Sequence, residues 1–280
     1  MKTYLNKIIK FSNVDGPGNR MAIFFQNCNF NCKYCHNPET ISLCVGCGKC
    51  VEVCPSKALE KVGNEIKWIE KNCIQCDRCT EICSHNSSPK VKNITVEELL
   101  NEIRKVKSFI KGITVSGGES TLNYIFLTEL FKRIKEEFPK LTCFVDTNGS
   151  LNLSDEKYKD FVNITDSFML DVKAWDEKEH LDLVGVDNKN VIKNLKYLLL
   201  IKKLYEVRTV IVDKYLNNEL TVKEVSKIIS NADIRYKIIK YRSIGVRESM
   251  KNDLKIPTDI RLQELKEIAN SLNVKNALVI

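Results

Sequence analysis

Short hydrophobic runs alternate along the chain with longer stretches in which hydrophobic residues recur every three or four positions. The runs of strand length are residues 21–26, 112–116, 141–145, 167–170, 207–212 and 236–241. The helical patterns are residues 96–106, 121–138, 188–203, 221–231 and a last one opened by Pro257 and Thr258. Strands that alternate with helices form right-handed βαβ units around a parallel sheet. The pattern predicts an α/β fold, either a partial (β/α)6-type barrel or an open curved sheet.

Two of these elements carry strong local signals. Thr95 and Glu98 form a capping box, with Ile94 and Leu99 placed for a hydrophobic staple. The run 21–26 is almost entirely apolar, as in a parallel strand covered on both faces. Whatever follows residue 26 is therefore expected at the carboxyl end of the first strand, where α/β proteins place their active sites.

Three closely spaced cysteines follow that strand. Cys28, Cys32 and Cys35 have three and then two intervening residues. Three thiolates would leave one iron of a 4Fe–4S cluster open for a non-protein ligand, because such a cluster usually has four cysteine ligands. The alternative is a zinc site with His36 as fourth ligand. His36 directly follows Cys35 and is poorly placed to close a tetrahedron, so the cluster is favoured.

Residues 43–92 interrupt the α/β pattern with a repeat. The spacing Cys-x2-Cys-x2-Cys-x3-Cys occurs twice, 29 residues apart, at Cys44, Cys47, Cys50 and Cys54 and at Cys73, Cys76, Cys79 and Cys83. This is the bacterial ferredoxin run, in which the fourth cysteine of each run ligates the other cluster. It assigns one 4Fe–4S cluster to Cys44, Cys47, Cys50 and Cys83, and another to Cys73, Cys76, Cys79 and Cys54.

The repeat divides the chain into two expected parts. Residues 1–42 and 93–280 would form the partial barrel, and residues 43–92 a dicluster ferredoxin-like insert. Pro55 follows the first cysteine run, whereas Ser84 stands at that place in the second. Zinc is again the alternative, although the runs hold more thiols than paired zinc sites need. Two extra clusters would relay electrons or, alternatively, only hold the insert together.

Polar residues stand where the later strands end. Gly117 and Gly118 would let backbone approach a ligand, and Glu119 could accept a hydrogen bond from an ammonium group. Asp171 and Lys173 point to the same face of an extended chain, as ligand-holding groups or simply as an ion pair.

Three further side chains belong to the same expected site. Asp146 ends the strand before that of Asp171. Arg208 lies among apolar neighbours, so it needs a buried anion as partner or must point into a cavity. Tyr34 would pack on a bound base or on the cluster.

Composition narrows the class of protein. The 280 residues are 43% hydrophobic and 29% charged, which is ordinary for a soluble globular protein. We see no apolar run of about 18 residues and no secretion signal, so we expect a cytoplasmic location and no membrane span. Twelve cysteines in such a chain indicate metal ligation rather than disulfides, with Cys143 as a buried core thiol.

The net charge of +8 raises the question of nucleic acid. Lys and Arg are scattered beside Glu and Asp in the helical patterns, and thiolates on clusters would lower the charge. We therefore expect no nucleic-acid partner.

Taken in order, the motifs resemble a known family. They are Val14-Asp-Gly-Pro-Gly-Asn-Arg20, the Cys28, Cys32 and Cys35 triplet, Ser116-Gly-Gly-Glu119, Asp146-Thr-Asn-Gly149 and Asp171-Val-Lys173. The triplet is similar to that of the radical S-adenosylmethionine (SAM) superfamily. The whole set resembles its glycyl radical enzyme activating enzymes, most closely the YjjW group, and covers essentially the whole chain.

The resemblance implies a function. SAM would bind the open iron of the cluster held by Cys28, Cys32 and Cys35, the catalytic residues. Its reductive cleavage would give a 5′-deoxyadenosyl radical that takes hydrogen from a glycine of a partner glycyl radical enzyme. The cofactors would be three 4Fe–4S clusters, SAM and a monovalent cation, and the electron donor a flavodoxin or ferredoxin.

Residue roles follow from the same resemblance. The expected cofactor contacts are Tyr34, Ser116, Gly117, Gly118, Glu119, Asp146, Asp171, Lys173 and Arg208. The partner's glycine loop would contact Asp15, Gly16, Pro17, Gly18 and Arg20, with the strand end at Asp171 and Lys173.

Two departures and two alternatives remain. Arg242 stands where relatives tend to have His, and Asp213-Lys214 where they often have Pro-Gly. One SAM contact and one loop shape are therefore in question. The alternatives to the activase are a radical SAM enzyme acting on a small molecule or another peptide, and a multi-cluster electron carrier that is no enzyme.

Overall fold

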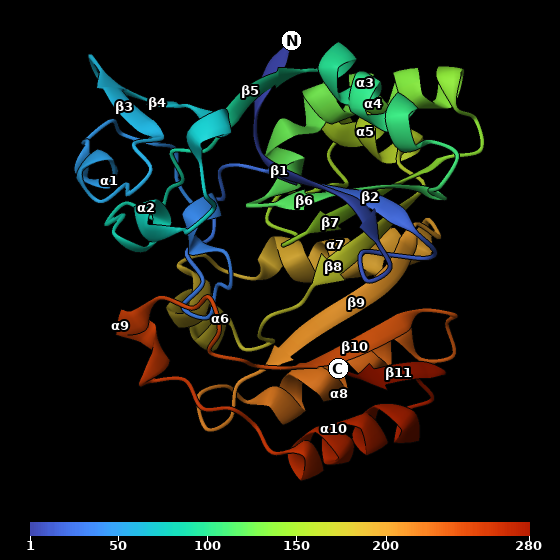
Figure 1. Cartoon of the computed structure of the whole chain (residues 1–280). Helices are drawn as coiled ribbons and strands as arrows, with labels where there is room; N and C mark the ends of the chain where they lie inside the picture. The colour runs from blue at the N-terminus through green and yellow to red at the C-terminus, as the bar shows by residue number, and fades with distance from the viewer.

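A computed structural model describes residues 1–280, and one sheet of nine strands runs through most of it (Figure 1). The strands are β1 (Lys2–Ser12), β2 (Arg20–Phe25), β5 (Lys92–Thr95), β6 (Gly112–Gly117), β7 (Thr142–Thr147), β8 (Ser167–Asp171), β9 (Leu204–Ile211), β10 (Arg235–Lys240) and β11 (Asn276–Val279). Their order is β11-β10-β9-β8-β7-β6-β2-β1-β5. From β2 to β11 all neighbours are parallel, whereas β1 is antiparallel to both β2 and β5. The six predicted strands are therefore confirmed and are consecutive in the sheet.

Helices cover the outer face of the sheet. They are α3 (Val96–Val106), α4 (Tyr124–Glu137), α5 (Lys159–Ile164), α7 (Lys189–Leu200), α8 (Asn218–Ile229) and α10 (Asp259–Ser271). Two further helices, α6 (Glu177–Val184) and α9 (Glu248–Lys251), lie off this face, to the left of the sheet in Figure 1. Short 3-10 helices are η1 (Pro38–Thr40), η3 (Ser120–Asn123) and η4 (Glu156–Tyr158). Figure 1 shows α3, α4 and α5 along the upper part of the sheet and α8 and α10 along its lower part.

The alternation of side chains along the strands separates a core from an inner face. In β6, Ile113 and Val115 are fully buried in the hydrophobic core. Thr114 and Ser116 lie on the opposite face of the strand, where they donate hydrogen bonds to polar partners. The core also contains Cys143, which is fully buried as predicted. The inner face is thus left for polar chemistry.

The predicted start of α3 is confirmed. The Thr95 hydroxyl accepts a hydrogen bond from the backbone N–H of Glu98, and the Glu98 carboxylate accepts one from the backbone N–H of Thr95. Ile94 and Leu99 are both buried, as a staple requires. The box fixes where the chain re-enters the sheet after residue 91.

Residues 43–91 form a small unit outside the main sheet, which Figure 1 places beside β5. Its elements are α1 (Lys49–Glu52), β3 (Leu59–Val62), β4 (Glu65–Trp68), η2 (Glu70–Asn72) and α2 (Arg78–Glu81). β3 and β4 pair only with each other, as an antiparallel hairpin. The chain leaves the barrel after η1 and returns at β5, so the unit is inserted between two barrel elements.

The N-terminal strand differs from the prediction. The sequence predicts only a short entry segment at 7–13, whereas β1 has 11 residues and pairs with both β2 and β5. Its exposed lysines dilute the hydrophobic signal because only one side of the strand packs on the core. The strand extends the sheet beyond the parallel part and flanks the insert.

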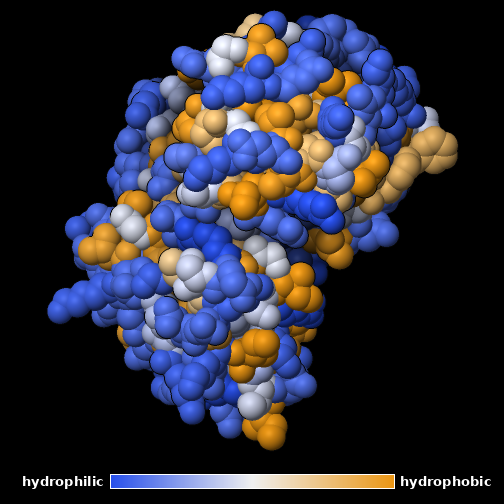
Figure 2. Space-filling view, turned by 60° about the vertical axis from the view of Figure 1, so that its left-hand side comes forward, coloured by the Kyte–Doolittle hydropathy of each residue, from blue (hydrophilic) through white to orange (hydrophobic).

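The surface is mixed in character. On the face drawn in Figure 2, hydrophilic residues dominate, and hydrophobic residues form several separate patches. The helices are all too short or too polar to cross a membrane.

Candidate functional site

A cavity with an empty volume of about 870 Å³, including its opening to solvent, lies at the carboxyl ends of the parallel strands. It gathers most of the residues predicted for the site: Cys28, Cys32, Tyr34, Cys35, Ser116, Gly117, Gly118, Glu119, Asp146, Asp171 and Lys173. Arg208 is the one predicted cofactor contact that does not line it. The parallel topology explains this convergence, because the ends of neighbouring parallel strands meet at one edge of a sheet.

The cysteine loop is held by three backbone hydrogen bonds, one to Ile41 and two to the end of α6. The N–H of Cys28 donates to the carbonyl of Ile41 at 2.8 Å. The N–H groups of Asn31 and Lys33 donate to the last carbonyls of α6, each at 2.9 Å. These contacts fix three thiols that are all at least partly buried.

A segment from the far end of the chain closes the loop on its other side. The Arg247 guanidinium donates to the carbonyl of Cys32 at 2.9 Å and to the side-chain oxygen of Asn31 at 2.8 Å. Gly245 has a φ of +79°, and a Cβ there would lie 2.4 Å from the carbonyl oxygen of His36. Only glycine fits this close approach, so the segment after β10 is shaped to cover the cysteine loop.

Burial raises the pKa of the three thiols. The values reach about 12 for Cys28 and about 11 for Cys32, and the pKa of Cys35 is also raised. The ordinary value for cysteine is about 8.5. Metal ligation by these residues must therefore displace three tightly held protons, since the thiolate is the ligand.

Cluster assembly should depend on pH for this reason. We expect the rate and extent of iron incorporation at limiting iron to rise between about pH 7 and pH 9, with release of protons. In the metal-free chain the folded state keeps these protons to higher pH than the unfolded chain does. Its stability should therefore fall as the pH rises above about 8.5. Visible absorbance during anaerobic reconstitution measures the first effect; assembly independent of pH would contradict it.

The two glycines after β6 pack against backbone. A Cβ on Gly117, whose φ is +117°, would lie 2.2 Å from the backbone of Phe25, and one on Gly118 would lie 2.1 Å from the carbonyl oxygen of Asn27. The predicted reason was a close approach to a ligand. The structure shows a close approach to the first strand and the cysteine loop. This brings Glu119 beside the thiols, where its N–H donates to Asn27 at 2.8 Å.

Glu119 is 1% exposed and has no cationic partner. Its carboxylate accepts hydrogen bonds from the backbone N–H and hydroxyl of Thr121, the hydroxyl of Thr147 and the backbone N–H of Asn148. Burial raises its pKa, although these donors act in the opposite direction. The residue thus ties the end of β6 to the end of β7 and adds a buried acid to the cavity wall.

Asp146 links the cavity to a charged network on the inner face of the sheet. It accepts from Ser116 at 3.0 Å and from Arg208 at 2.9 Å. Arg208 also bonds Glu206 at 2.6 Å, and Glu206 pairs with Lys237 at 3.0 Å. Of the two situations predicted for Arg208, the buried anionic partner is the one that the structure shows. Burial raises the pKa of Asp146, and the attraction of Arg208 opposes that rise.

Asp171 and Lys173 point to one side, as the spacing predicts. They form an ion pair of 2.9 Å, and the Lys173 ammonium lies 5.5 Å from the ring centre of Tyr34. Burial acts to lower the pKa of Lys173, but the nearby Asp171 outweighs it and holds the pKa above its ordinary value. The hydroxyl of Tyr34 is buried without a partner. The cavity wall therefore holds one ammonium group, that of Lys173, which is paired with Asp171. It also holds one hydroxyl donor, that of Tyr34, which has no partner in the protein.

The sequence assigned no role in the cavity to several residues that line it, among them Phe30, Thr147, Asn148 and Val210. Asn148 is the most informative, because its side-chain N–H group donates to the Cys28 sulfur at 3.8 Å. It lies two residues after Asp146, at the same strand end. Its place at the end of a predicted strand could have identified it as a residue of the site.

The predicted contact of Arg20 with a partner peptide is wrong. Arg20 is fully buried and donates to the hydroxyls of Thr114 and Thr142 at 2.7 and 2.9 Å and to the carbonyl of Ile113 at 2.5 Å. Its guanidinium also lies 4.2 Å from the ring centre of Phe144. The prediction fails because Arg20 begins β2 and its side chain points into the barrel, toward Thr114 of the neighbouring strand. It anchors the loop before β2 instead of facing solvent.

Other residues of that loop keep some exposure. Asp15 and Pro17 are half-buried and Gly18 is exposed, whereas Gly16 packs on the Arg20 side chain. None of them lines the cavity. The two departures also lie outside it: Arg242 is exposed, and Asp213 forms a β-bridge with Lys255.

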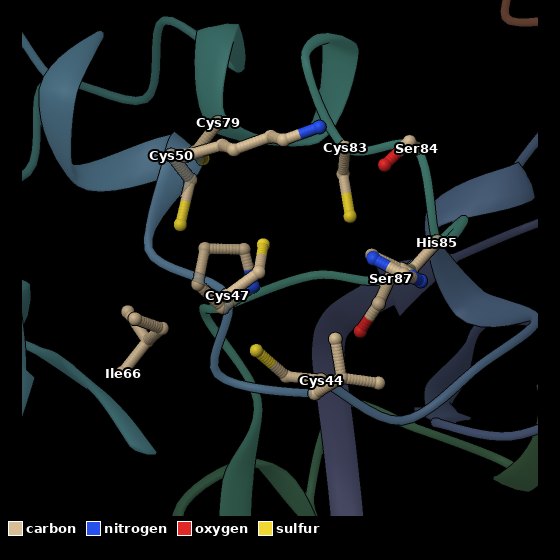
Figure 3. Close-up of a pocket in the computed structure, with 12 residues that line it drawn as sticks. Cys44, Cys47, Cys50, Ile66, Cys79, Cys83, Ser84, His85 and Ser87 are labelled. Atoms are coloured by element: carbon tan, nitrogen blue, oxygen red, sulfur yellow. The ribbon is translucent and has the colours of Figure 1, made fainter. Parts of the chain in front are cut away.

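The insert contains two further cavities lined by thiols. Cys83 lies with Cys44, Cys47 and Cys50 around one of about 360 Å³ (Figure 3), and Cys54 lies with Cys73 and Cys76 around one of about 320 Å³; both volumes include the openings. Cys79 lines both. Each fourth cysteine thus lies with the opposite run, which is the crossover that the spacing predicts.

The thiols of the insert lie around cavities and do not meet at one point. No three His, Cys, Asp or Glu side chains converge closely enough to hold one metal ion. A single zinc ion needs its four ligands at bond distance from one point. A set of thiols spread around a cavity suits a larger group that bonds each thiol through a different iron.

Comparison with known proteins defines the class. The family model of the radical SAM superfamily matches residues 22–212, about two thirds of the chain, and the chain therefore belongs to this superfamily. It is 28% identical to a Haemophilus influenzae protein named as a glycyl-radical enzyme activating enzyme, over 99% of this chain and 96% of that protein. It is 26% identical to the pyruvate formate-lyase-activating enzyme of Staphylococcus aureus, over 89% and 84% of the two chains.

The fold has solved counterparts. The structure of QueE from Escherichia coli superposes with a TM-score of 0.55, over all of this chain and 94% of that one, at 11% identity. The mixed α/β fold with a parallel sheet is therefore that of the superfamily. The superfamily in turn implies one 4Fe–4S cluster and SAM.

Proposed function

We propose that this protein is a glycyl radical enzyme activating enzyme. The observation that carries the proposal is the cavity at the strand ends, which places three thiols without a fourth beside the polar groups of β6, β7 and β8. The names of the two relatives agree with it. Within this class, the motifs resemble those of the YjjW group.

Cys28, Cys32 and Cys35 would hold the 4Fe–4S cluster, and the rest of the cavity would hold SAM on the open iron. When bound and reduced, the cluster supplies the electron that cleaves SAM and so generates the radical that takes hydrogen from glycine. Glu119, Asp171 and Lys173 would bind and orient the charged groups of SAM. Tyr34 would pack against the cofactor and supply its free hydroxyl as a donor.

The remaining predicted cofactor contacts differ in whether they reach the cavity directly. Ser116 and Asp146 line the cavity, and Arg208 reaches it only through Asp146. Arg208 would therefore position Asp146. The monovalent cation stays a prediction from the resemblance, since the carboxylates of Asp146 and Asp171 already have Arg208 and Lys173 as partners.

The partner's glycine loop would enter along the open inner face of the sheet. Asp15, Pro17 and Gly18 supply the exposed part of the loop before β2, and Arg20 holds it in place from below. The ion pair of Asp171 and Lys173 lies at the other end of the path, beside the thiols. A peptide of this course would bring a glycine Cα to the cavity and cover it from water and oxygen.

Residues 43–92 would form the dicluster ferredoxin-like domain, with residues 1–42 and 93–280 as the partial barrel. The two thiol cavities of the insert support this division. The clusters there would accept electrons from a flavodoxin or ferredoxin and pass them inward.

The test is 5′-deoxyadenosine formation from SAM by the anaerobic, reconstituted and reduced protein. We expect production above a control without protein. With a glycyl radical enzyme labelled with deuterium at glycine Cα, we expect deuterium in the 5′-deoxyadenosine. Cleavage without deuterium transfer would favour a radical SAM enzyme with another substrate. If fully iron-loaded protein does not cleave SAM even with the partner present, the alternative of a multi-cluster electron carrier would be favoured.

Replacing Cys47 tests the insert separately. Cys47→Ala should remove one auxiliary cluster, lowering iron from about twelve to about eight atoms per chain. SAM binding should be nearly unchanged, because Cys47 lies outside the main cavity. Turnover with a flavodoxin donor should fall more than turnover with a chemical reductant. Equal turnover with flavodoxin would argue for a structural role of that cluster.

A further inference from the structure

Three thiol-lined cavities each present one buried hydrogen-bond donor that has no partner. They are the hydroxyl of Tyr34 in the main cavity, the hydroxyl of Ser87 in the cavity of Cys44 and Cys83, and the indole N–H of Trp68 in the cavity of Cys54 and Cys73. Only nine buried side-chain polar atoms in the whole chain lack a partner. Buried donors are almost always paired, so one orphan in each thiol cavity indicates an acceptor that the protein itself does not supply.

Ser87 is built into its cavity. The residue is 1% exposed, and Figure 3 shows its hydroxyl on the side of the cavity where Cys44 and Cys83 lie. Removing a hydroxyl from water without a hydrogen bond is costly, and an alanine would have filled the same space without that cost. The position therefore fits a group in the cavity that accepts a hydrogen bond.

Trp68 supplies the unpartnered donor of the second cavity. It ends β4, and its ring lies 5.1 Å from the Lys92 ammonium. This contact on the ring helps to fix the indole plane while its N–H remains buried and unpartnered. An indole N–H can only donate, so its partner must be an acceptor.

We propose that Ser87 and Trp68 each donate a hydrogen bond to a sulfur of one auxiliary 4Fe–4S cluster and thereby set its reduction potential. This inference rests on the proposed dicluster insert. Hydrogen bonds to the sulfurs are one of the means by which a protein tunes such a cluster. A donated bond stabilises the more negative, reduced cluster and raises its potential. Because a hydroxyl and an indole N–H are different donors, the two clusters would have different reduction potentials.

The experiment is a redox titration of the reconstituted holoprotein, followed by electron paramagnetic resonance of each reduced cluster. Ser87→Ala should lower the potential of the cluster at Cys44, Cys47, Cys50 and Cys83, and Trp68→Phe that of the other cluster only. At a fixed applied potential we expect the ratio of reduced to oxidised cluster to fall roughly fivefold, the size of one net hydrogen bond. Ser226→Ala is the matched control, because Ser226 is an equally buried, unpartnered hydroxyl outside all three cavities.

A second measurement needs no variant. In deuterium oxide, pulsed resonance spectra of the wild type should show an exchangeable deuteron coupled to each auxiliary cluster. Potentials that match the wild type in both variants, with a full complement of iron, would overturn the inference and leave the dicluster insert intact. A wild-type protein that binds only about four irons would overturn both, since only the main cluster would then be present.

Discussion

Cys32→Ala should abolish 5′-deoxyadenosine formation while leaving the insert loaded with iron. Cys32 is 8% exposed at the centre of the cysteine loop, and its loss leaves two thiols for a cluster that needs three from this chain. Loss of an outer-shell partner alone commonly costs up to about 100-fold, so loss of a ligand should cost more and bring turnover to background. Iron should fall from about twelve to about eight atoms per chain.

Cys143→Ala is the matched control for this prediction. It removes the same thiol from the one cysteine that belongs to no cavity and is packed in the core. We expect unchanged iron content and turnover, with a modest loss of stability from the small cavity. SAM cleavage retained by Cys32→Ala at normal cluster content would refute the assignment of the site.

Arg20→Met should lower the melting temperature of the holoprotein by roughly 5–15 °C. The change leaves the acceptors at Thr114, Thr142 and Ile113 buried without their donor, which costs about 2–4 kcal/mol in total even though the cost of burying the cation is relieved. Burial lowers the pKa of Arg20 to about 10, which shows how strongly this side chain is withdrawn from water. The loop before β2 should loosen with it.

Arg104→Met controls for the loss of a guanidinium. Arg104 is on the surface of α3 and bonds the carboxylates of Glu97 and Glu137. Exposed pairs contribute about 0–1 kcal/mol, so the melting temperature should move by no more than about 3 °C. Equal shifts for the two variants, measured by differential scanning calorimetry, would show that Arg20 is no buried anchor.

The sequence was most informative where one spacing determines both position and chemistry. The hydrophobic runs gave all six barrel strands, and the cysteine repeat gave the grouping of Cys83 and Cys54 with opposite runs. The alternation along a strand follows from the pleat of the backbone. The spacing of the cysteines follows from the size of the cluster that they bind.

The sequence was least informative where a side chain can point either into the fold or toward solvent. Arg20 opens a strand, and a charged residue there is usually exposed. Its burial depends on acceptors that are distant in the sequence, among them the hydroxyls of Thr114 and Thr142, 94 and 122 positions away. Arg208 is a similar case, since Asp146 lies 62 positions away. The weakly apolar edge strands β5 and β11, and the strand β1 beside β5, were missed because only one of their sides packs on the core.

The contact between Arg247 and Cys32 has a consequence for how the protein is made. These residues are 215 positions apart, so a ribosome that has just completed the cysteine loop has yet to synthesise the residue that covers it. At roughly 5–20 residues per second, this takes on the order of 10–45 s. During that time the nascent loop is open to iron and to oxidants alike. A cluster bound before Arg247 has been synthesised would lack this cover, and one bound afterwards would have it.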